Sequence, residues 1–103
     1  MNNNKDNQDF FDVLRKVSKN PETTQREMAS DLGFSLGKLN YCLKALKKKG
    51  LVKITNFKKN PNKLNYLYYL TPKGITAKTN LTINFMKRKM QEYEELKMEI
   101  EDR

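Results

Sequence analysis

The sequence predicts a mainly α-helical domain with one small β-hairpin, an α+β arrangement that ends in a single long helix. Three observations lead to this prediction. Before Gly50, apolar residues recur every three to four positions in three short segments. Two runs rich in branched and aromatic residues then flank an Asn-Pro-Asn turn. After Pro72 a helical repeat continues to about Glu101, and 103 residues is the length of one domain.

The chain divides into three parts. Residues 1–9 are rich in asparagine and have no periodicity, so we expect a disordered tail. Residues 10–71 carry the helix and strand signals of the folded domain, and residues 72–103 form the final helix. Asp9 can cap the first helix, and an Asn-Pro dipeptide ends it.

The second helix has clear signals at both ends. Thr24 and Glu27 fit a capping box, in which a threonine hydroxyl and a glutamate three residues later satisfy each other's backbone amides. Gly33 permits the turn that stops the helix, and Ser35 can cap the next one. This order of helix, glycine turn and helix is the outline of a helix-turn-helix motif. The expected buried residues of the second helix and turn are Met28, Ala29, Leu32 and Phe34.

The third helix, residues 35–49, is predicted to have an apolar back and a polar front. The apolar stripe consists of Leu36, Leu39, Leu43 and Leu46. On the opposite face Gly37 allows close approach, while Asn40 and Tyr41 suit base edges and phosphates. Lys44 and Lys48 share that face, with Lys38 at its margin. A leucine stripe opposite lysines is also typical of any surface helix, so this pattern alone leaves both interpretations open.

Residues 51–57 and 64–70 read as two strands, joined by the turn KKNPNK at 58–63. They predict a hairpin with positive charge at its tip. Its lysines could simply protect an exposed sheet edge from aggregation. Directly after a helix-turn-helix motif, we favour a wing that lies along a phosphate backbone, because its charge matches the segments around it.

The charge of the chain is unevenly distributed. The net charge is +9, and between Leu32 and Gln91 there are fourteen lysines and arginines with no aspartate or glutamate. A solvated surface usually mixes both signs. A block of one sign indicates an anionic partner, with nucleic acid first and a membrane surface second, although a merely soluble basic domain has the same composition.

The composition argues against catalysis and against secretion. The chain has no histidine and one cysteine, Cys42, and no glycine-rich phosphate loop or paired-carboxylate site is evident. We therefore expect no enzyme, no metal site and no cofactor, and a buried structural thiol at Cys42 rather than a redox sensor. No apolar run approaches the roughly 18 residues of a membrane span, and the N-terminus lacks a secretion signal. The expected location is cytoplasmic.

The final helix carries an apolar stripe that a small domain cannot cover. A helix of this length needs a partner for its outer part, most simply a second copy of the chain packed as a coiled coil. Basic residues 87–89 followed by acidic residues near 92–99 favour an antiparallel pair. The candidate dimerisation residues are Ile83, Met86, Met90, Tyr93, Leu96 and Ile100.

The run TQREMASDLGFSLGKLNYCLKALKKKGLVKI, the basic hairpin and the YYLTPKG that follows resemble the winged helix-turn-helix transcriptional regulators of the MarR family. The resemblance covers about residues 10–80 and is closest to the small exopolysaccharide-associated members. It implies a winged helix-turn-helix followed by one long C-terminal dimerisation helix. It also implies a homodimeric, sequence-specific double-stranded DNA-binding regulator, with exopolysaccharide biosynthesis genes as its targets.

By that resemblance, the helix at 35–49 enters the major groove and the wing at 57–64 reaches the flanking backbone or minor groove. The sequence departs from the family in its short N-terminus, its single final helix and the lysines that replace a wing arginine. For these reasons we do not expect a small-molecule effector. The candidate DNA-binding residues are Ser35, Gly37, Lys38, Asn40, Tyr41, Lys44, Lys48, Lys58, Lys59, Asn60 and Lys63.

Two other functions fit the same sequence. The basic block could bind RNA or DNA without sequence preference, as an architectural protein does. Alternatively, the domain could serve protein contacts, with the long helix coupling it to a partner. A recognition face with hydrogen-bonding side chains favours specific duplex DNA over both.

Overall fold

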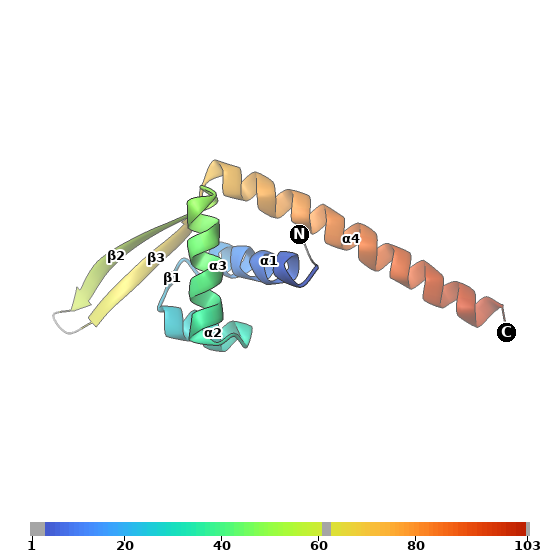
Figure 1. The fold of residues 1–103 in the computed structure, drawn as a ribbon, viewed down its shortest axis with the longest axis horizontal. Helices are drawn as coiled ribbons and strands as arrows, with labels where there is room; N and C mark the ends of the chain where they lie inside the picture. Colours follow the sequence, from blue (N-terminus) through green and yellow to red (C-terminus); the bar gives the residue numbers. More distant parts are fainter. Residues whose placement is uncertain (1–3, 61–62, 103) are drawn as a thin grey trace.

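The computed structural model describes the backbone of residues 4–60 and 63–102, and side chains over 7–56 and 66–102. Three short helices and a small sheet form a compact body, from which the last helix projects (Figure 1). The molecule is therefore elongated, measuring 65 × 26 × 25 Å. In chain order the elements are α1 (Asn4–Lys19), β1 (Glu22–Thr23), α2 (Gln25–Leu32), α3 (Leu36–Lys48), β2 (Val52–Asn60), β3 (Lys63–Leu70) and α4 (Pro72–Glu101).

The first helix begins earlier than the sequence pattern indicates. Residues 4–9, expected to belong to a disordered tail, are helical, and residues 1–3 lie outside the described residues. Asp9 is not a cap, since its half-buried carboxylate pairs with Lys38 Nζ of α3 at 3.2 Å. In the same part of α1, the side-chain amide of Gln8 donates to the carboxylate of Asp12 at 2.9 Å. The pairing of Asp9 with a helix far along the chain is a contact of which local periodicity contains no sign.

The helix-turn-helix is confirmed, together with its capping residues. Glu27 N donates to Thr24 Oγ1 at 3.0 Å, and Thr24 N donates to Glu27 Oε1 at 3.2 Å, which completes the capping box. Gly33 has φ 72°, a left-handed conformation that ends α2. Ser35 then caps α3, because its hydroxyl accepts a hydrogen bond from Lys38 N at 3.1 Å.

The sheet contains the predicted hairpin and one strand that the sequence did not reveal. Its order is β1-β3-β2, antiparallel throughout. The hairpin strands extend further toward the turn than expected, and a register shift falls between Lys58 and Asn60. Strand β1 pairs only Glu22 and Thr23 with β3, and Tyr68 N donates to Pro21 O beside it at 2.7 Å. Two residues are too few to show a period of two, so no sequence pattern could have predicted β1.

The hydrophobic core lies where α1, α2 and the sheet surround one face of α3. Cys42 is 1% exposed, in agreement with the expected buried thiol. Leu36, however, is 43% exposed, so its assignment to the buried stripe is wrong. It lies in the first turn of α3, at the edge of the side of the helix that is buried in the core. The core residues are Val13, Leu14, Val17, Met28, Ala29, Leu39, Cys42, Leu43, Leu46, Val52 and Tyr68.

The start of α4 is held against the end of α3. Thr71 N donates to Leu51 O at 3.0 Å, and the Thr71 hydroxyl donates to Gly50 O. The same hydroxyl caps α4 by accepting from Gly74 N at 3.0 Å, and Pro72 occupies the first turn. A Cβ at Gly74 would stand 2.0 Å from the carbonyl oxygen of Leu51. The TPKG motif therefore serves as a close-packed junction that sets where α4 leaves the body.

We predict that Gly74→Ala destabilises the fold, because the added methyl group meets backbone that cannot rotate away. The free energy of unfolding should fall by about 1–3 kcal/mol, as for other overpacked positions. Gly37→Ala is the matched control: its Cβ would meet nothing within 4 Å, and the helical position should gain up to about 1 kcal/mol. Denaturant unfolding followed by circular dichroism, at one protein concentration, measures both. Equal stability of Gly74→Ala and the native chain would contradict the close approach.

Tyr68 is a fully buried side chain with a polar end. Its hydroxyl has no hydrogen-bond partner among the described residues. Burial raises the pKa of Tyr68 to about 12, with a smaller rise from Tyr66 and an opposing effect of the nearby Gln25 amide. The fold therefore favours the neutral phenol, and its contribution to stability is complete below the ordinary tyrosine pKa of about 10.

We predict that Tyr68→Phe removes part of the alkaline sensitivity of the fold. As the pH rises from 10 to 12, the native chain should lose about 1.4 kcal/mol per pH unit from this group alone, because the unfolded state releases the proton first. Below pH 9 the phenylalanine variant should be as stable or up to about 1 kcal/mol more stable, since a buried hydroxyl without a partner is removed. Unfolding curves at several pH values test this. Parallel alkaline losses in both proteins would show that Tyr68 ionises freely.

Candidate nucleic-acid interface

The outer face of α3 presents a continuous polar surface. Gly37, Asn40, Tyr41, Lys44 and Lys48 are all exposed, because each points away from the buried arc at about 100° per residue. Tyr41 is 59% exposed, although it is large and aromatic. The structure thus brings together on one face the α3 residues selected from the sequence. Their role in binding remains a prediction.

Two further residues of the predicted set have other contacts. Lys38 lies on the side of α3 that faces α1, where it pairs with Asp9 and sits 4.3 Å from the ring centre of Phe34. The ring of Phe10 stacks at 6.3 Å from that of Tyr41 on the same side. Ser35 uses its hydroxyl to cap α3. Within the protein, Lys38 and Ser35 therefore make contacts that hold α3 in place.

The hairpin projects from the body beside α3 (Figure 1). Lys58 lies opposite Leu64, and Asn60 lies opposite Lys63, so the predicted wing residues occupy the far half of the hairpin. The side chains of Lys58, Lys59, Asn60 and Lys63 lie outside the described part of the structure. Their contacts with DNA stay a prediction from the sequence.

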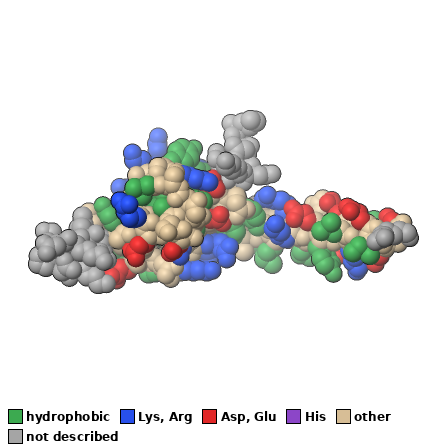
Figure 2. Space-filling model, turned by 90° about the horizontal axis from the view of Figure 1, so that it is seen from below, with side chains coloured by type: hydrophobic (Ala, Val, Ile, Leu, Met, Phe, Trp, Pro, Cys, Tyr) green, Lys and Arg blue, Asp and Glu red, His purple; other side chains and the backbone are tan. Residues whose placement is uncertain are grey.

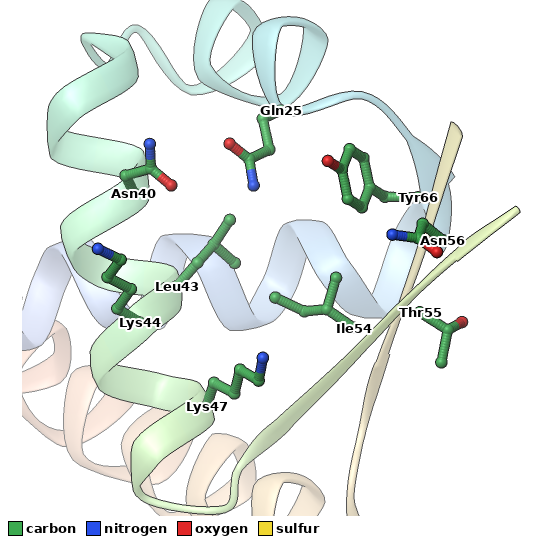
Figure 3. A pocket seen from close by; sticks show the side chains of 9 residues that line it. All are labelled: Gln25, Asn40, Leu43, Lys44, Lys47, Ile54, Thr55, Asn56 and Tyr66. Atoms are coloured by element: carbon green, nitrogen blue, oxygen red, sulfur yellow. The ribbon is translucent and has the colours of Figure 1, made fainter. Parts of the chain in front are cut away.

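A polar cleft lies between α3 and the base of the hairpin (Figure 3). Its volume is about 260 Å³, and none of its nine lining residues is acidic. Lys47 extends from α3 toward Ile54, whereas Thr55 points away from the cleft. The Tyr66 hydroxyl and the Asn40 amide both point toward Gln25. The lining residues are Gln25, Asn40, Leu43, Lys44, Lys47, Ile54, Thr55, Asn56 and Tyr66.

Most residues of this cleft were not predicted from the sequence. Strand alternation could have placed Asn56 on the same side as Ile54, and helical spacing could have placed Lys47 near Asn40 and Leu43. Gln25 carries no signal, because it comes from a different helix. Only tertiary packing brings these groups to one place.

A groove lies between α1 and α4. The rings of Phe11 and Phe85 stack at 4.8 Å between centres, with an interplanar angle of 14°. Arg15 lies 5.6 Å from the Phe11 ring centre, and Arg88 lies 4.5 Å from that of Phe85. The groove has a volume of about 520 Å³. Its lining residues are Phe11, Arg15, Lys78, Thr82, Phe85, Met86, Lys89 and Met90.

Along and beyond this groove, the apolar residues in the outer part of α4 are exposed. Their exposed fractions lie between 44% at Ile83 and 70% at Ile100. Figure 2 shows hydrophobic side chains beside acidic ones on the outer half of the helix, and basic side chains nearer the body. The candidate dimerisation residues Ile83, Met86, Met90, Tyr93, Leu96 and Ile100 are all uncovered in the single chain.

Among the described residues, no three carboxylate or cysteine side chains stand close enough to hold a metal ion. Among the described helices, none is both long and apolar enough to cross a membrane.

The fold defines a winged helix-turn-helix protein. Residues 11–53 match the protein family described as "Winged helix-turn-helix DNA-binding". This segment runs from within α1 through α2 and α3 to the first residues of β2, so it contains the helix-turn-helix and the outer face of α3. No curated protein matches the chain.

Solved structures share the fold at low sequence identity. The protein smu.1704 from Streptococcus mutans UA159 matches with a TM-score of 0.71 and 21% identity, over 82% of each chain. FabT from Streptococcus pneumoniae, solved in complex with DNA, has a TM-score of 0.61 and 21% identity over 91% of this chain. MarR from Staphylococcus aureus, solved with salicylate and kanamycin, has a TM-score of 0.64 and 22% identity over 84% of this chain. The present chain spans 61% of the FabT chain and 56% of the MarR chain.

Proposed function

We propose that this chain is a sequence-specific, double-stranded DNA-binding transcriptional regulator that acts as a homodimer. Helix α3 enters the major groove, and the hairpin at 57–64 contacts the flanking backbone or the minor groove. The observation that carries the proposal is the outer face of α3, where Asn40 and Tyr41 stand exposed beside Lys44 and Lys48. Amide and phenol groups can read base edges, while lysines contact phosphates.

The arrangement of α3 on the body supports this assignment. A recognition helix must present its full outer side to a groove about 12 Å wide, with nothing of the body in front of it. Helix α3 is buried along one arc only, and the residues on its opposite face are exposed. The match of residues 11–53 to a DNA-binding family and the fold shared with a DNA-bound protein support the same assignment.

A homodimer would cover the apolar residues that α4 leaves exposed. From Ile83 to Ile100 the helix carries apolar residues that are 44–70% exposed in the single chain. An antiparallel pair of α4 helices would bring basic residues 87–89 near acidic residues of the partner, as the charge order of the helix suggests. Two recognition helices so linked could bind half-sites one turn of DNA apart, about 34 Å.

The cellular setting follows from the same proposal. The chain acts on DNA in the cytoplasm, without a metal or cofactor and without catalysis. Its resemblance to exopolysaccharide-associated regulators makes exopolysaccharide biosynthesis genes the first targets to test. An architectural role without sequence preference is the second candidate function, favoured by the acid-free block from Leu32 to Gln91.

We predict that Asn40→Ala and Tyr41→Ala weaken binding to the preferred duplex much more than binding to random duplex. Each lost base contact should cost about 1–3 kcal/mol at the specific site only. Selection from a random duplex pool supplies the preferred site, and fluorescence anisotropy at fixed salt gives the two affinities. Lys48→Gln is the control, because loss of a phosphate contact should weaken both duplexes alike. If the Asn40 and Tyr41 variants also affect both equally, these residues do not read the sequence, and the placement of α3 in the major groove is wrong.

We predict that Met86→Lys with Met90→Lys dissociates the dimer, since it places two charges in the apolar stripe. These side chains are 58% and 66% exposed in the single chain, so the monomer should still fold. Asn84→Lys with Gln91→Lys adds the same charge on the opposite side of α4 and should leave the dimer intact.

Size-exclusion chromatography with light scattering gives the assembly state of these variants. The monomeric variant should also lose the two-fold preference in DNA selection, because the half-sites are no longer linked. A native chain that is monomeric at tens of micromolar would contradict dimerisation through α4.

A further inference from the structure

The cleft between α3 and the hairpin base is lined by hydrogen-bond donors from three elements. Lys47 contributes an ammonium group from α3, Asn56 an amide from β2, and Gln25 an amide from the first turn of α2. The side chains of Lys47 and Asn56 are exposed and have no hydrogen-bond or ion-pair partner among the described residues. Leu43 and Ile54 form an apolar floor beneath them.

The chemistry of this cleft fits a phosphate group. Lysine, asparagine, glutamine and tyrosine are among the side chains that contact nucleic-acid backbones, and all four types line it. No acidic side chain lines the cleft to repel an anion. Its volume of about 260 Å³ lies below the roughly 300–1,000 Å³ of sites for drug-sized ligands. A small anionic group therefore suits it better than an organic molecule.

The location of the cleft indicates which molecule would supply that phosphate. Asn40 and Lys44 line the cleft and also belong to the outer face of α3, so the two surfaces are continuous. The opposite wall is the base of the hairpin that projects beside α3. A duplex whose major groove holds α3 would thus place one of its backbones along this wall.

We propose that the cleft seats one backbone phosphate of the bound DNA, with Lys47 as the cation and Asn56 and Gln25 as neutral donors. The proposal rests on the proposed function, since it needs α3 in the major groove. Such a contact carries no sequence information, but it fixes the depth and rotation of α3 in the groove. Lys47, Asn56 and Gln25 are thereby positioning residues for recognition by Asn40 and Tyr41.

The first test compares Lys47→Gln with Lys53→Gln. Both residues are exposed lysines and lose the same charge, but Lys53 lies on the other side of β2 from Ile54 and Asn56. Lys47→Gln should weaken duplex binding about tenfold, the effect of one hydrogen bond to a charged group. It should also reduce the slope of log affinity against log salt by about 0.9, the value for one phosphate. Lys53→Gln should leave both quantities close to native.

The second test identifies the phosphate itself. Single phosphates in the preferred duplex are neutralised by ethylation, and those that inhibit native binding are mapped. For Lys47→Gln, Asn56→Ala and Gln25→Ala, ethylation at one shared position should no longer inhibit. The Lys53→Gln map should match the native one.

These outcomes separate the two proposals. If the native chain binds no duplex, the proposed function itself fails. If it binds with the Asn40 and Tyr41 dependence, yet Lys47→Gln and Lys53→Gln behave alike and no ethylation position is lost, only the phosphate seat is wrong. Titration with inorganic phosphate, followed by amide chemical shifts, tests a free anion as occupant. Saturation of the cleft at micromolar phosphate, without loss of an ethylation position, would also overturn the assignment to DNA.

Discussion

The whole arrangement depends on the burial of one arc of α3. Leu39, Cys42, Leu43 and Leu46 are at most 2% exposed, and they pack against α1, α2 and the sheet at once. Because one side of α3 is fixed in the core, the helix cannot rotate about its axis. Each of its other residues therefore faces a defined direction. One side meets α1, the opposite side meets the hairpin base, and the side between them meets solvent. Removing one of these leucines would cost about 2–5 kcal/mol and would also loosen the orientation of the surface.

Features set by local sequence were predicted correctly, and features set by distant partners were not. The capping residues Thr24 and Ser35, the glycine turn, the hairpin and the start of α4 at Pro72 each follow from a few neighbouring residues. The short strand β1 and the pairing of Asp9 with Lys38 depend on contacts between segments far apart in the chain, and the early start of α1 has no sign in its local sequence. The same holds for the site: helical spacing gave the outer face of α3, but the cleft needs three elements together.

The inner turns of α4 pack against the body on one side only. Leu81 packs against the core and Phe85 stacks on Phe11. Other large apolar residues of the helix, from Ile75 to Ile100, are exposed, as the periodicity predicted for its outer part. Because Gly74 packs against Leu51, the direction of α4 is coupled to the end of α3. A second chain bound to the outer turns would therefore hold two α3 helices in a defined relation.

The pairing of Lys38 with Asp9 also shapes the charge around α3. It compensates one lysine on the side that faces α1, where Lys49 also lies 5.2 Å from the ring centre of Phe10. On the side that faces the hairpin, Lys44 and Lys47 line a cleft without any carboxylate. Because no acidic residue of the cleft offsets these two lysines, a duplex backbone would be attracted to that side. The charge of the cleft and its position beside α3 therefore favour the same docking of a DNA backbone.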